Sequence, residues 1–296
     1  MTSNSEPVVQ VAGLTKSYGE FAALQGVDFE IRRGETFALL GPNGAGKSTT
    51  IEILEGFRNR SGGTVSVLGT DPQHGGLDWK ARLGIVLQST GEPGNVTVRE
   101  QLAHFAGFYP HPKDVDEVID AVGLREKAKT RIKALSGGQR RRVDVALGII
   151  GRPEVLFLDE PTTGFDPEAR RAFWDLIRGL QAEGTSILLT THYLDEAAQL
   201  SDRAVVIAGG LVVAEGRIDE LGGADARVPI VRWRDDGGLR EERTQSPAAF
   251  VADLTARTGG EPRDLEVVRP SLEDIYLELV EADEAASAST KEPQLS

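Results

Sequence analysis

The chain has 296 residues, of which 40% are hydrophobic and 27% charged, a composition typical of a folded globular protein with one large core and an appendage. It contains no cysteine, which excludes disulfides and thiolate metal ligands. The net charge of −13 argues against nucleic acid as a partner, and we find neither a signal-peptide pattern nor an apolar run that could cross a bilayer, so we expect any membrane role to depend on a partner.

The first predicted elements are a small antiparallel flap and a core strand. Alternating or continuous apolar residues mark four strands. The pair Gly62-Gly63 separates the fourth strand from the helix that precedes it. A glycine-rich loop at 41–46 and a helix to about Glu55 lie between the third strand and the fourth. Residues 1–7 are expected to be a tail. The predicted strands are Val8–Leu14, Val27–Ile31, Phe37–Leu40 and Thr64–Leu68.

A helical insertion is predicted for about residues 97–150, where the apolar residues have helical spacing. After it come short apolar runs suited to a buried parallel sheet, and a hairpin at Gly209-Gly210 leads to a last strand. The pattern predicts an α/β core over residues 8–216. The strands of this part are Val155–Leu158, Ser186–Thr190, Ala204–Ile207 and Leu211–Ala214.

Residues 217–280 are predicted to form a small α+β accessory domain. Strand-like segments flank a helix over Pro247–Ala256, and a capping box from Ser271 to Asp274 starts a last helix. We expect the apolar face of that helix to pack on its own domain rather than on a partner. The acidic, small-residue stretch 281–296 is expected to be disordered. The strand-like segments are Val228–Trp233 and Leu265–Val268, and the apolar face contains Leu272, Ile275, Tyr276 and Leu279.

One segment, Gly41–Ser48, fits the pattern G-x-x-x-x-G-K-[ST] between a predicted strand and a predicted helix. Such a loop surrounds phosphates with backbone N–H groups, while Lys47 supplies a positive charge and Ser48 a hydroxyl for Mg²⁺. A purely structural turn is the alternative. The predicted fold is therefore α/β: a P-loop NTPase core with a mixed sheet, an antiparallel flap, a helical insertion and an α+β accessory domain. The predicted ATP-binding residues of this loop are Gly41, Pro42, Asn43, Gly44, Ala45, Gly46, Lys47, Ser48 and Thr49.

The apolar strand Val155–Leu158 runs into two carboxylates, Asp159 and Glu160. This arrangement places Asp159 to hold Mg²⁺ and Glu160 nearer the γ-phosphate, where it is a candidate general base for the attacking water. An apolar strand that ends in acidic residues is common, so the prediction depends on its combination with the phosphate loop.

The segment Leu135–Gln139, with the sequence LSGGQ, precedes a predicted helix and resembles the signature of the ABC (ATP-binding cassette) ATPases. The order of the motifs extends this resemblance over about residues 8–216. In that family two cassettes meet head to tail, and the resemblance implies that Ser136, Gly137, Gly138 and Gln139 contact the ATP of a second copy. Free N–H donors at a helix start suit an anion, although Ser136 could also be an ordinary helix cap.

The same resemblance implies roles for four more residues. Gln88 matches the Q-loop glutamine, which reaches Mg²⁺ and the attacking water, and His192 matches the switch histidine that hydrogen-bonds the γ-phosphate. Tyr18 matches the aromatic ring that stacks on adenine. Asp166 belongs to the D-loop of the dimer interface, where Phe165 replaces the usual leucine. The implied catalytic residues are Glu160, His192 and Gln88, and the implied Mg²⁺ ligands are Ser48, Gln88 and Asp159.

Two other groups of polar residues receive structural interpretations. The run Arg140–Arg142 after the signature is interpreted as a solvated or salt-bridged helix face rather than a nucleic-acid site. His74, His104 and His111 have no metal-ligand spacing and are interpreted as surface residues.

The resemblance implies an ATP hydrolase subunit that works as a dimer at the cytoplasmic face of the membrane and drives a separately encoded permease. The segment Thr191–Ala197 and the accessory domain ending in Arg269–Leu279 look most like the drug-resistance export group exemplified by daunorubicin export. A cytosolic ABC ATPase that acts on ribosomes or nucleic acid is the alternative. A P-loop kinase is a third possibility, but it leaves the signature and His192 without a role.

Overall fold

The computed structural model describes residues 7–87 and 95–290, with side chains as far as residue 282. The contacts divide the chain into two compact units, Met1–Ile218 and Asp219–Ser296, close to the boundary expected at 216. Of the predicted tails, Pro7 belongs to the first strand, whereas residues 1–6 and 291–296 lie outside the described residues.

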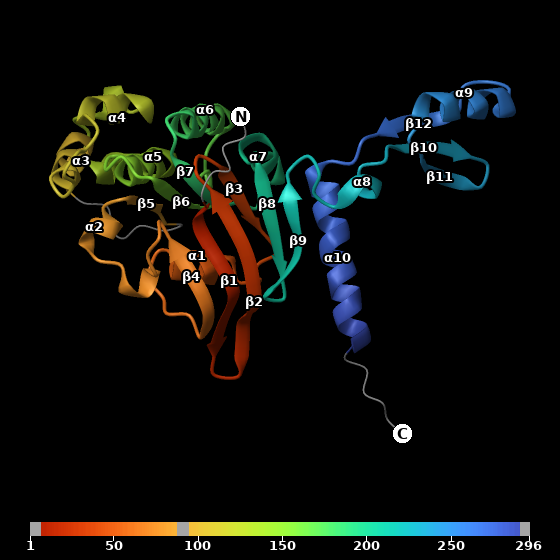
Figure 1. Cartoon of the computed structure of the whole chain (residues 1–296). Helices are drawn as coiled ribbons and strands as arrows, with labels where there is room; N and C mark the ends of the chain where they lie inside the picture. The colour runs from red at the N-terminus through yellow and green to blue at the C-terminus, as the bar shows by residue number, and fades with distance from the viewer. Residues whose placement is uncertain (1–6, 88–94, 291–296) are drawn as a thin grey trace, which may run out of the picture. The chain divides into compact units, whose positions relative to one another are not determined.

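A six-stranded sheet forms the centre of the first unit (Figure 1), with the strand order β5-β6-β7-β3-β8-β9. The first five strands are parallel, and β9 pairs with β8 in the antiparallel direction, so the expected mixed sheet is confirmed. Both faces of β3 and β7 are buried, which explains their continuous apolar sequences. The strands are β3 (Thr36–Leu40), β5 (Leu83–Val86), β6 (Val155–Asp159), β7 (Ser186–Thr190), β8 (Arg203–Ala208) and β9 (Leu211–Arg217).

An antiparallel flap of three strands, in the order β2-β1-β4, lies beside this sheet. Its inner side chains, such as Val9, Leu14 and Ile31, share one core cluster with Phe37 of β3 and Ile207 of β8. The predicted flap is confirmed, and the strand after the first helix joins it rather than the central sheet. The flap strands are β1 (Pro7–Tyr18), β2 (Phe21–Arg32) and β4 (Gly62–Val67).

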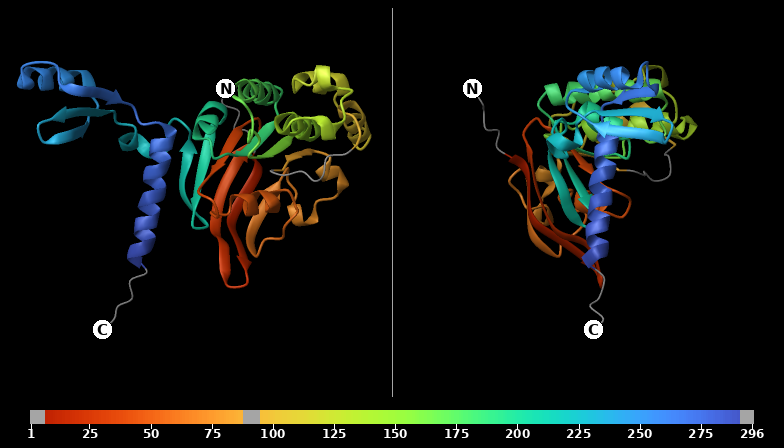
Figure 2. Two further views of the ribbon diagram at one scale, coloured as in Figure 1. Left: turned by 180° about the vertical axis from the view of Figure 1, so that it is seen from behind. Right: turned by 90° about the vertical axis from the view of Figure 1, so that its right-hand side faces the viewer.

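The helices of the first unit include the predicted insertion, in which α3 and α4 pack against α5 (Figure 2). A Thr97–Glu100 capping box starts α3, and Asp114 caps α4. Short 3₁₀ turns occur at Pro72–His74, Arg125–Lys127 and Ile132–Ala134. The helices are α1 (Lys47–Leu54), α2 (Leu77–Lys80), α3 (Val98–Ala106), α4 (Val115–Ala121), α5 (Gly137–Ile149), α6 (Pro167–Ala182) and α7 (Leu194–Leu200).

The second unit is built on a three-stranded antiparallel sheet in the order β11-β10-β12. Helix α9 lies against it, with the ring of Phe250 5.5 Å from that of Trp233. We did not predict β11 from the sequence, because its five residues after Gly238 are exposed and four of them are charged. The elements are α8 (Gly223–Ala226), β10 (Ile230–Asp235), β11 (Gly238–Arg243), α9 (Pro247–Thr258), β12 (Arg263–Val268) and α10 (Leu272–Thr290).

Helix α10 begins as predicted and ends later than expected. The Ser271 hydroxyl accepts from the Asp274 N–H at 3.2 Å, and the Asp274 carboxylate accepts from the Ser271 N–H at 2.7 Å. Leu272 and Ile275 are buried on the predicted face. Disorder was expected from residue 281, but the structure continues the helix to Thr290, since alanine and glutamate favour helix in the absence of a stop signal.

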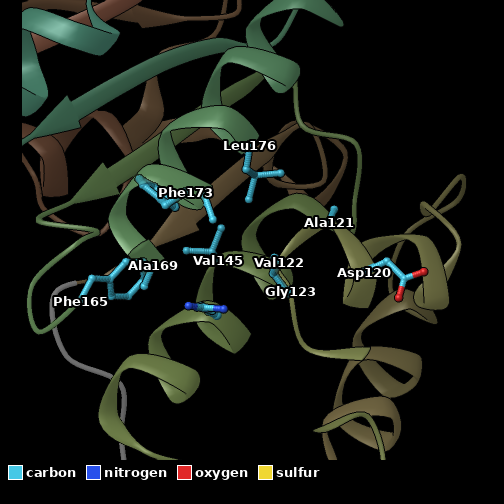
Figure 3. A pocket seen from close by; sticks show the side chains of 11 residues that line it. Asp120, Ala121, Val122, Gly123, Val145, Phe165, Ala169, Phe173 and Leu176 are labelled. Atoms are coloured by element: carbon cyan, nitrogen blue, oxygen red, sulfur yellow. The ribbon is translucent and has the colours of Figure 1, made fainter. Parts of the chain in front are cut away.

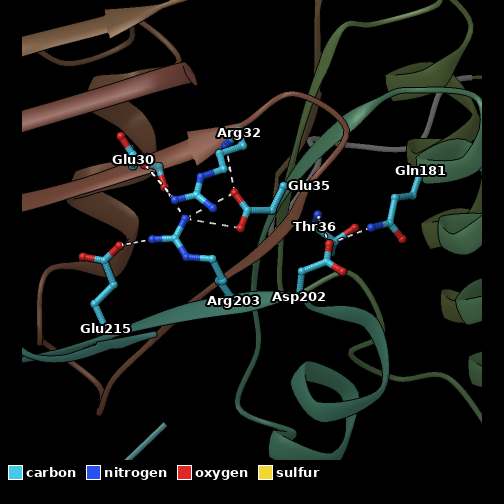
Figure 4. A network of polar contacts seen from close by, with 8 residues as sticks. All are labelled: Glu30, Arg32, Glu35, Thr36, Gln181, Asp202, Arg203 and Glu215. Atoms are coloured by element: carbon cyan, nitrogen blue, oxygen red, sulfur yellow. Dashed lines mark hydrogen bonds and ion pairs between the residues drawn. The ribbon is translucent and has the colours of Figure 1, made fainter. Parts of the chain in front are cut away.

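A partly buried arginine, Arg203, joins the flap to the central sheet (Figure 4). Its guanidinium donates to the Glu30 carbonyl at 3.2 Å and to the Glu35 carboxylate at 3.3 Å, and it also pairs with Glu215. Glu35 is buried, and burial raises the pKa of Glu215. Arg203 lies at the amino end of β8, away from the phosphate loop, so its role is structural.

The substitution Arg203→Met is expected to lower the free energy of unfolding by about 3 kcal/mol, because it removes the cation that pairs with the buried carboxylate of Glu35 and leaves that charge with the Arg32 N–H as a donor. Urea denaturation measures this loss. The exposed arginine Arg178, which pairs with Asp175, gives the control: Arg178→Met should change stability by less than about 0.5 kcal/mol. Equal stabilities of the two variants would contradict the prediction.

Candidate functional site

The candidate site forms where the carboxyl ends of three neighbouring strands meet. β7 lies between β3 and β6, and all three are parallel. The phosphate loop 41–46 follows β3, and His192 comes soon after the end of β7. Asp159 is the last residue of β6, and Glu160 follows it. Segments that are far apart in the sequence therefore reach the same edge of the sheet, the usual ligand position in such folds.

The phosphate loop takes a conformation that only glycine allows at two points. At Gly41, with φ of 154°, an added Cβ would lie 2.1 Å from the Ile207 carbonyl oxygen. At Gly46, with φ of 105°, an added Cβ would lie 2.5 Å from the Leu24 side chain and 2.8 Å from a backbone oxygen. The loop thus turns tightly against β8 and the flap and leads directly into α1. This geometry supports a phosphate-binding loop at a helix N-terminus.

Lys47 is the first residue of α1, and its ammonium lies back over the loop. Its Nζ donates to the carbonyls of Gly41 at 2.7 Å and Pro42 at 3.0 Å. Burial lowers the pKa of Lys47, whereas the nearby Glu160 and Asp159 raise it. The positive charge therefore lies between the loop and the two carboxylates. Ser48 is exposed in the first turn of α1.

The two carboxylates at the end of β6 are oriented by β7. The register pairs Asp159 with Thr190, whose hydroxyl donates to Asp159 Oδ1 at 2.5 Å. The Glu160 N–H donates to the Thr190 carbonyl at 3.1 Å and is 3.2 Å from its hydroxyl. His192 Nδ1 lies 3.3 Å from Glu160 Oε1. The structure thus brings the predicted base and the predicted switch histidine together, and it adds Thr190, which sequence analysis missed.

The arginine run after the signature is not simply a solvated face. Arg141 is only 7% exposed, and its guanidinium donates to the backbone carbonyls of Asp159 at 2.6 Å and Glu160 at 3.1 Å. It also donates to the carbonyls of Pro161 and Leu87. The surface interpretation is therefore wrong for Arg141, which lies on the buried face of α5. Its spacing of four residues from the apolar Val145 was the sequence signal.

The signature segment starts α5 with a capping box. Ser136 Oγ accepts from the Gln139 N–H at 3.2 Å, and the Gln139 side chain accepts from the Ser136 N–H at 3.1 Å. The helix-cap alternative for Ser136 is thus realised. Ser136 and Gly137 are exposed, and within the described residues no hydrogen bond joins them or Gly138 to the phosphate loop of the same chain.

The D-loop residues are anchored on α6. Asp166 caps this helix by accepting from the Ala169 N–H at 2.8 Å. The Phe165 ring is buried, packs edge-on against Phe173 at 5.9 Å and lies beneath the Arg142 guanidinium. It borders an apolar cavity of about 200 Å³ between α4, α5 and α6 (Figure 3). A phenylalanine at this position thus fills space between the insertion and α6.

Two further predicted residues lie apart from this cluster. Tyr18 ends β1 and is 39% exposed, and Lys16 Nζ and Arg58 Cζ lie over its ring, 5.1 and 5.2 Å from the ring centroid. The residue is therefore partly accessible, with two cationic groups over the ring on which a base would stack. Gln88 lies outside the described residues, although the preceding Leu87 is held by Arg141.

Glu55, at the end of α1, is a buried carboxyl that sequence analysis did not single out. It is 3% exposed, and its Oε2 atom has no hydrogen-bond partner within the described part of the chain. Burial, together with the negative charges of Asp159 and Glu52, raises its pKa to about 8. The neutral acid is therefore the form that the fold favours at neutral pH.

The pKa of Glu55 is raised in the folded state, so its protonated carboxyl favours the folded over the unfolded protein. This contribution to the free energy of unfolding is complete below about pH 4.5 and is lost as the pH rises through 8. The amide in Glu55→Gln cannot ionise, so this variant should be more stable than the unsubstituted protein at pH 9, by on the order of 2–4 kcal/mol. Near pH 4 the two should differ little. Urea denaturation at several pH values across this range measures the difference in stability. If the stabilities of the two proteins change with pH in the same way, the raised pKa of Glu55 is wrong.

Comparison with known proteins agrees with these features. Residues 24–163 match the ABC transporter family. The Nod factor export ATP-binding protein I of Ralstonia nicotianae is 42% identical over 223 residues, which cover 73% of this chain and 69% of that protein. A daunorubicin resistance ATP-binding protein of Streptomyces coeruleorubidus is 34% identical over 94% of this chain and 98% of its own length.

Solved structures resemble the fold. An ATP-binding subunit of an ABC transporter superposes with a TM-score of 0.69 over 92% of this chain and 99% of its own, at 24% identity. The cbiO1 protein of Clostridium perfringens, part of the ABC transporter complex cbiONQ, gives a TM-score of 0.65 at 28% identity over 72% of this chain and 89% of its own. With the motifs and the full-length relatives, these findings show that the chain belongs to the ABC transporter family as an ATP-hydrolysing, ATP-binding protein.

Proposed function

We propose that the chain powers a separate integral-membrane permease that exports a drug or another small molecule. The observation that carries this proposal is the full-length similarity to a daunorubicin resistance protein, which extends past the cassette through the second unit. The Nod factor export proteins point in the same direction. No helix in the described ranges is both long and apolar enough to cross a membrane. We place the chain at the cytoplasmic face as part of this proposal, on its similarity to the export ATP-binding proteins.

The proposed working form is a head-to-tail dimer that encloses two ATP molecules. Ser136 and Gly137 are exposed at the start of α5, at the positive end of the helix dipole. The Ser136 N–H already donates to Gln139, so Gly137 and Gly138 would supply the N–H donors, which have no partner within the helix itself. Within one chain they do not bind the phosphate loop, so a second copy would have to supply the phosphates that they contact. Gly138, Gln139 and the D-loop residue Asp166 would lie at the same interface.

Each residue of the site has a proposed role in hydrolysis. Tyr18 stacks on adenine, and the loop 41–49 with Lys47 holds the phosphates. Glu160 accepts a proton from the attacking water, and His192, 3.3 Å away, keeps that carboxylate oriented and donates to the γ-phosphate. Closure of the dimer on ATP would drive the permease to its outward-facing state, and hydrolysis would reopen the dimer.

The oxygen-bearing side chains predicted to bind a metal ion also fit Mg²⁺. The described residues contain no cluster of three or more acidic, histidine or cysteine side chains, and Mg²⁺ needs none, because it keeps waters and substrate phosphates as ligands. Ser48 and Asp159, with Gln88, would hold it. When bound, it would neutralise charge on the phosphates. Thr190 fixes Asp159 through the hydrogen bond to Oδ1.

The test is affinity purification of tagged Glu160→Gln with ATP from detergent-solubilised native membranes, followed by mass spectrometry. Recovery of a polytopic membrane protein supports the transporter, and that protein would carry the substrate specificity. Recovery of ribosomes or nucleic-acid-binding proteins would instead favour the cytosolic alternative, which the net charge of −13 already disfavours. Lys47→Ala, which should not trap the ATP-bound state, is the matched control.

A further inference from the structure

Arg141 connects three separate segments of the site through one guanidinium. It lies on α5, five residues after Ser136 of the signature. Its nitrogens donate to the carbonyls of Asp159, Glu160 and Pro161, at 2.6, 3.1 and 3.1 Å, and to the carbonyl of Leu87. The planar guanidinium offers five N–H donors in a fixed arrangement, which lysine cannot reproduce.

The backbone that Arg141 holds is in an unusual conformation. Glu160 has φ of 46°, the left-handed region that residues with a side chain rarely adopt. Its N–H donates to the Thr190 carbonyl, and its own carbonyl accepts from Arg141 at 3.1 Å and, more weakly, from the Thr163 N–H at 3.4 Å. This conformation points the Glu160 carboxylate toward His192 and Lys47. A relaxed backbone at Glu160 would move the carboxylate away from them.

We propose that Arg141 is a positioning residue for ATP hydrolysis, holding Glu160 in its strained conformation and tying that residue to the signature helix and to Leu87. This inference rests on the proposed role of Glu160 as the base. A shift of about 1 Å in a reacting group can slow a reaction by roughly 10²-fold, so loss of this anchor should act on turnover. ATP binding should be little changed, since Arg141 donates to no residue of the phosphate loop in the described structure.

The first experiment compares Arg141→Met with Arg203→Met, which removes another arginine with a side chain only 14% exposed, at the opposite end of the sheet strands. Turnover and KM for ATP are measured well below the unfolding temperature of each variant. Arg141→Met should lower kcat at least about tenfold and change KM less than about threefold, whereas Arg203→Met should keep both values. Arg141→Lys keeps a cation and is less disruptive to folding, so its kcat should lie between those of Arg141→Met and the unsubstituted protein.

The second experiment places Arg141→Met in the Glu160→Gln protein. If Arg141 acts through Glu160, the double variant should turn over no more slowly than Glu160→Gln alone. A further drop equal to that seen in the single variant would overturn the inference. So would an Arg141→Met protein that loses stability as Arg203→Met does but keeps its kcat. Normal turnover of Glu160→Gln alone would show instead that the base is misassigned, whatever Arg141 does.

Discussion

Glu160→Gln is expected to hydrolyse ATP about 10²–10⁴-fold more slowly than the unsubstituted protein, while it still binds ATP. The amide keeps the size of the side chain and its place beside His192, but it cannot accept the proton of the attacking water. Because closure depends on bound ATP and reopening on hydrolysis, the variant should accumulate as an ATP-bound dimer. Phosphate release measures turnover, and light scattering after size-exclusion chromatography with ATP measures the dimer.

Glu154→Gln is the matched control for this change. Glu154 precedes β6 at the end of the strand opposite Glu160, and it pairs with Arg82 and Arg33, which hold its pKa below the usual range. The same acid-to-amide change there should leave turnover within about twofold. A normal rate in Glu160→Gln would show that another group accepts the proton. A slow variant that stays monomeric with ATP would contradict the dimer.

Lys47→Ala is expected to weaken ATP binding by roughly 10²-fold, and turnover at fixed ATP should fall at least as much. The ammonium is partly buried between the phosphate loop and two carboxylates, so its removal takes away the positive charge that lies over the loop. A charge-assisted hydrogen bond to a phosphate contributes about 1.5–3 kcal/mol, which accounts for a loss of this size. Titration with a fluorescent ATP analogue measures the affinity.

Lys113→Ala is the corresponding control, because Lys113 pairs with Glu183 outside the site. It should bind ATP normally. Affinity and turnover in Lys47→Ala that match those of Lys113→Ala would remove the basis for the phosphate-loop assignment. If Lys47→Ala binds ATP normally but turns over slowly, the lysine acts on the transition state rather than on binding.

Features that depend on neighbouring residues could be predicted from the sequence. The glycines of the phosphate loop, the apolar core strands and the capping box at Ser271 are set by local backbone and side-chain chemistry. The signature helix start at Ser136 is local in the same sense. In the core strands of the first unit, the predicted first and last residues therefore agree with the observed bounds to within a few residues.

Other features could not be predicted, because they depend on exposed sequence or on long-range contacts. β11 is charged and exposed, so it carries no apolar alternation, and α10 continues past residue 281 without a stop signal. The charge of Arg141 suggested a surface residue, whereas its position on the buried face of α5 places it among backbone carbonyls.

The sequence by itself determined the residues that can hold phosphate, donate a cation and accept a proton, because those properties belong to the residue types and to their local spacing. Only the tertiary structure decided which of them meet. The parallel register of β6 and β7 pairs Asp159 with Thr190 and brings His192 to Glu160, 32 positions earlier in the chain. Such contacts depend on strand order and packing, which local chemistry does not specify.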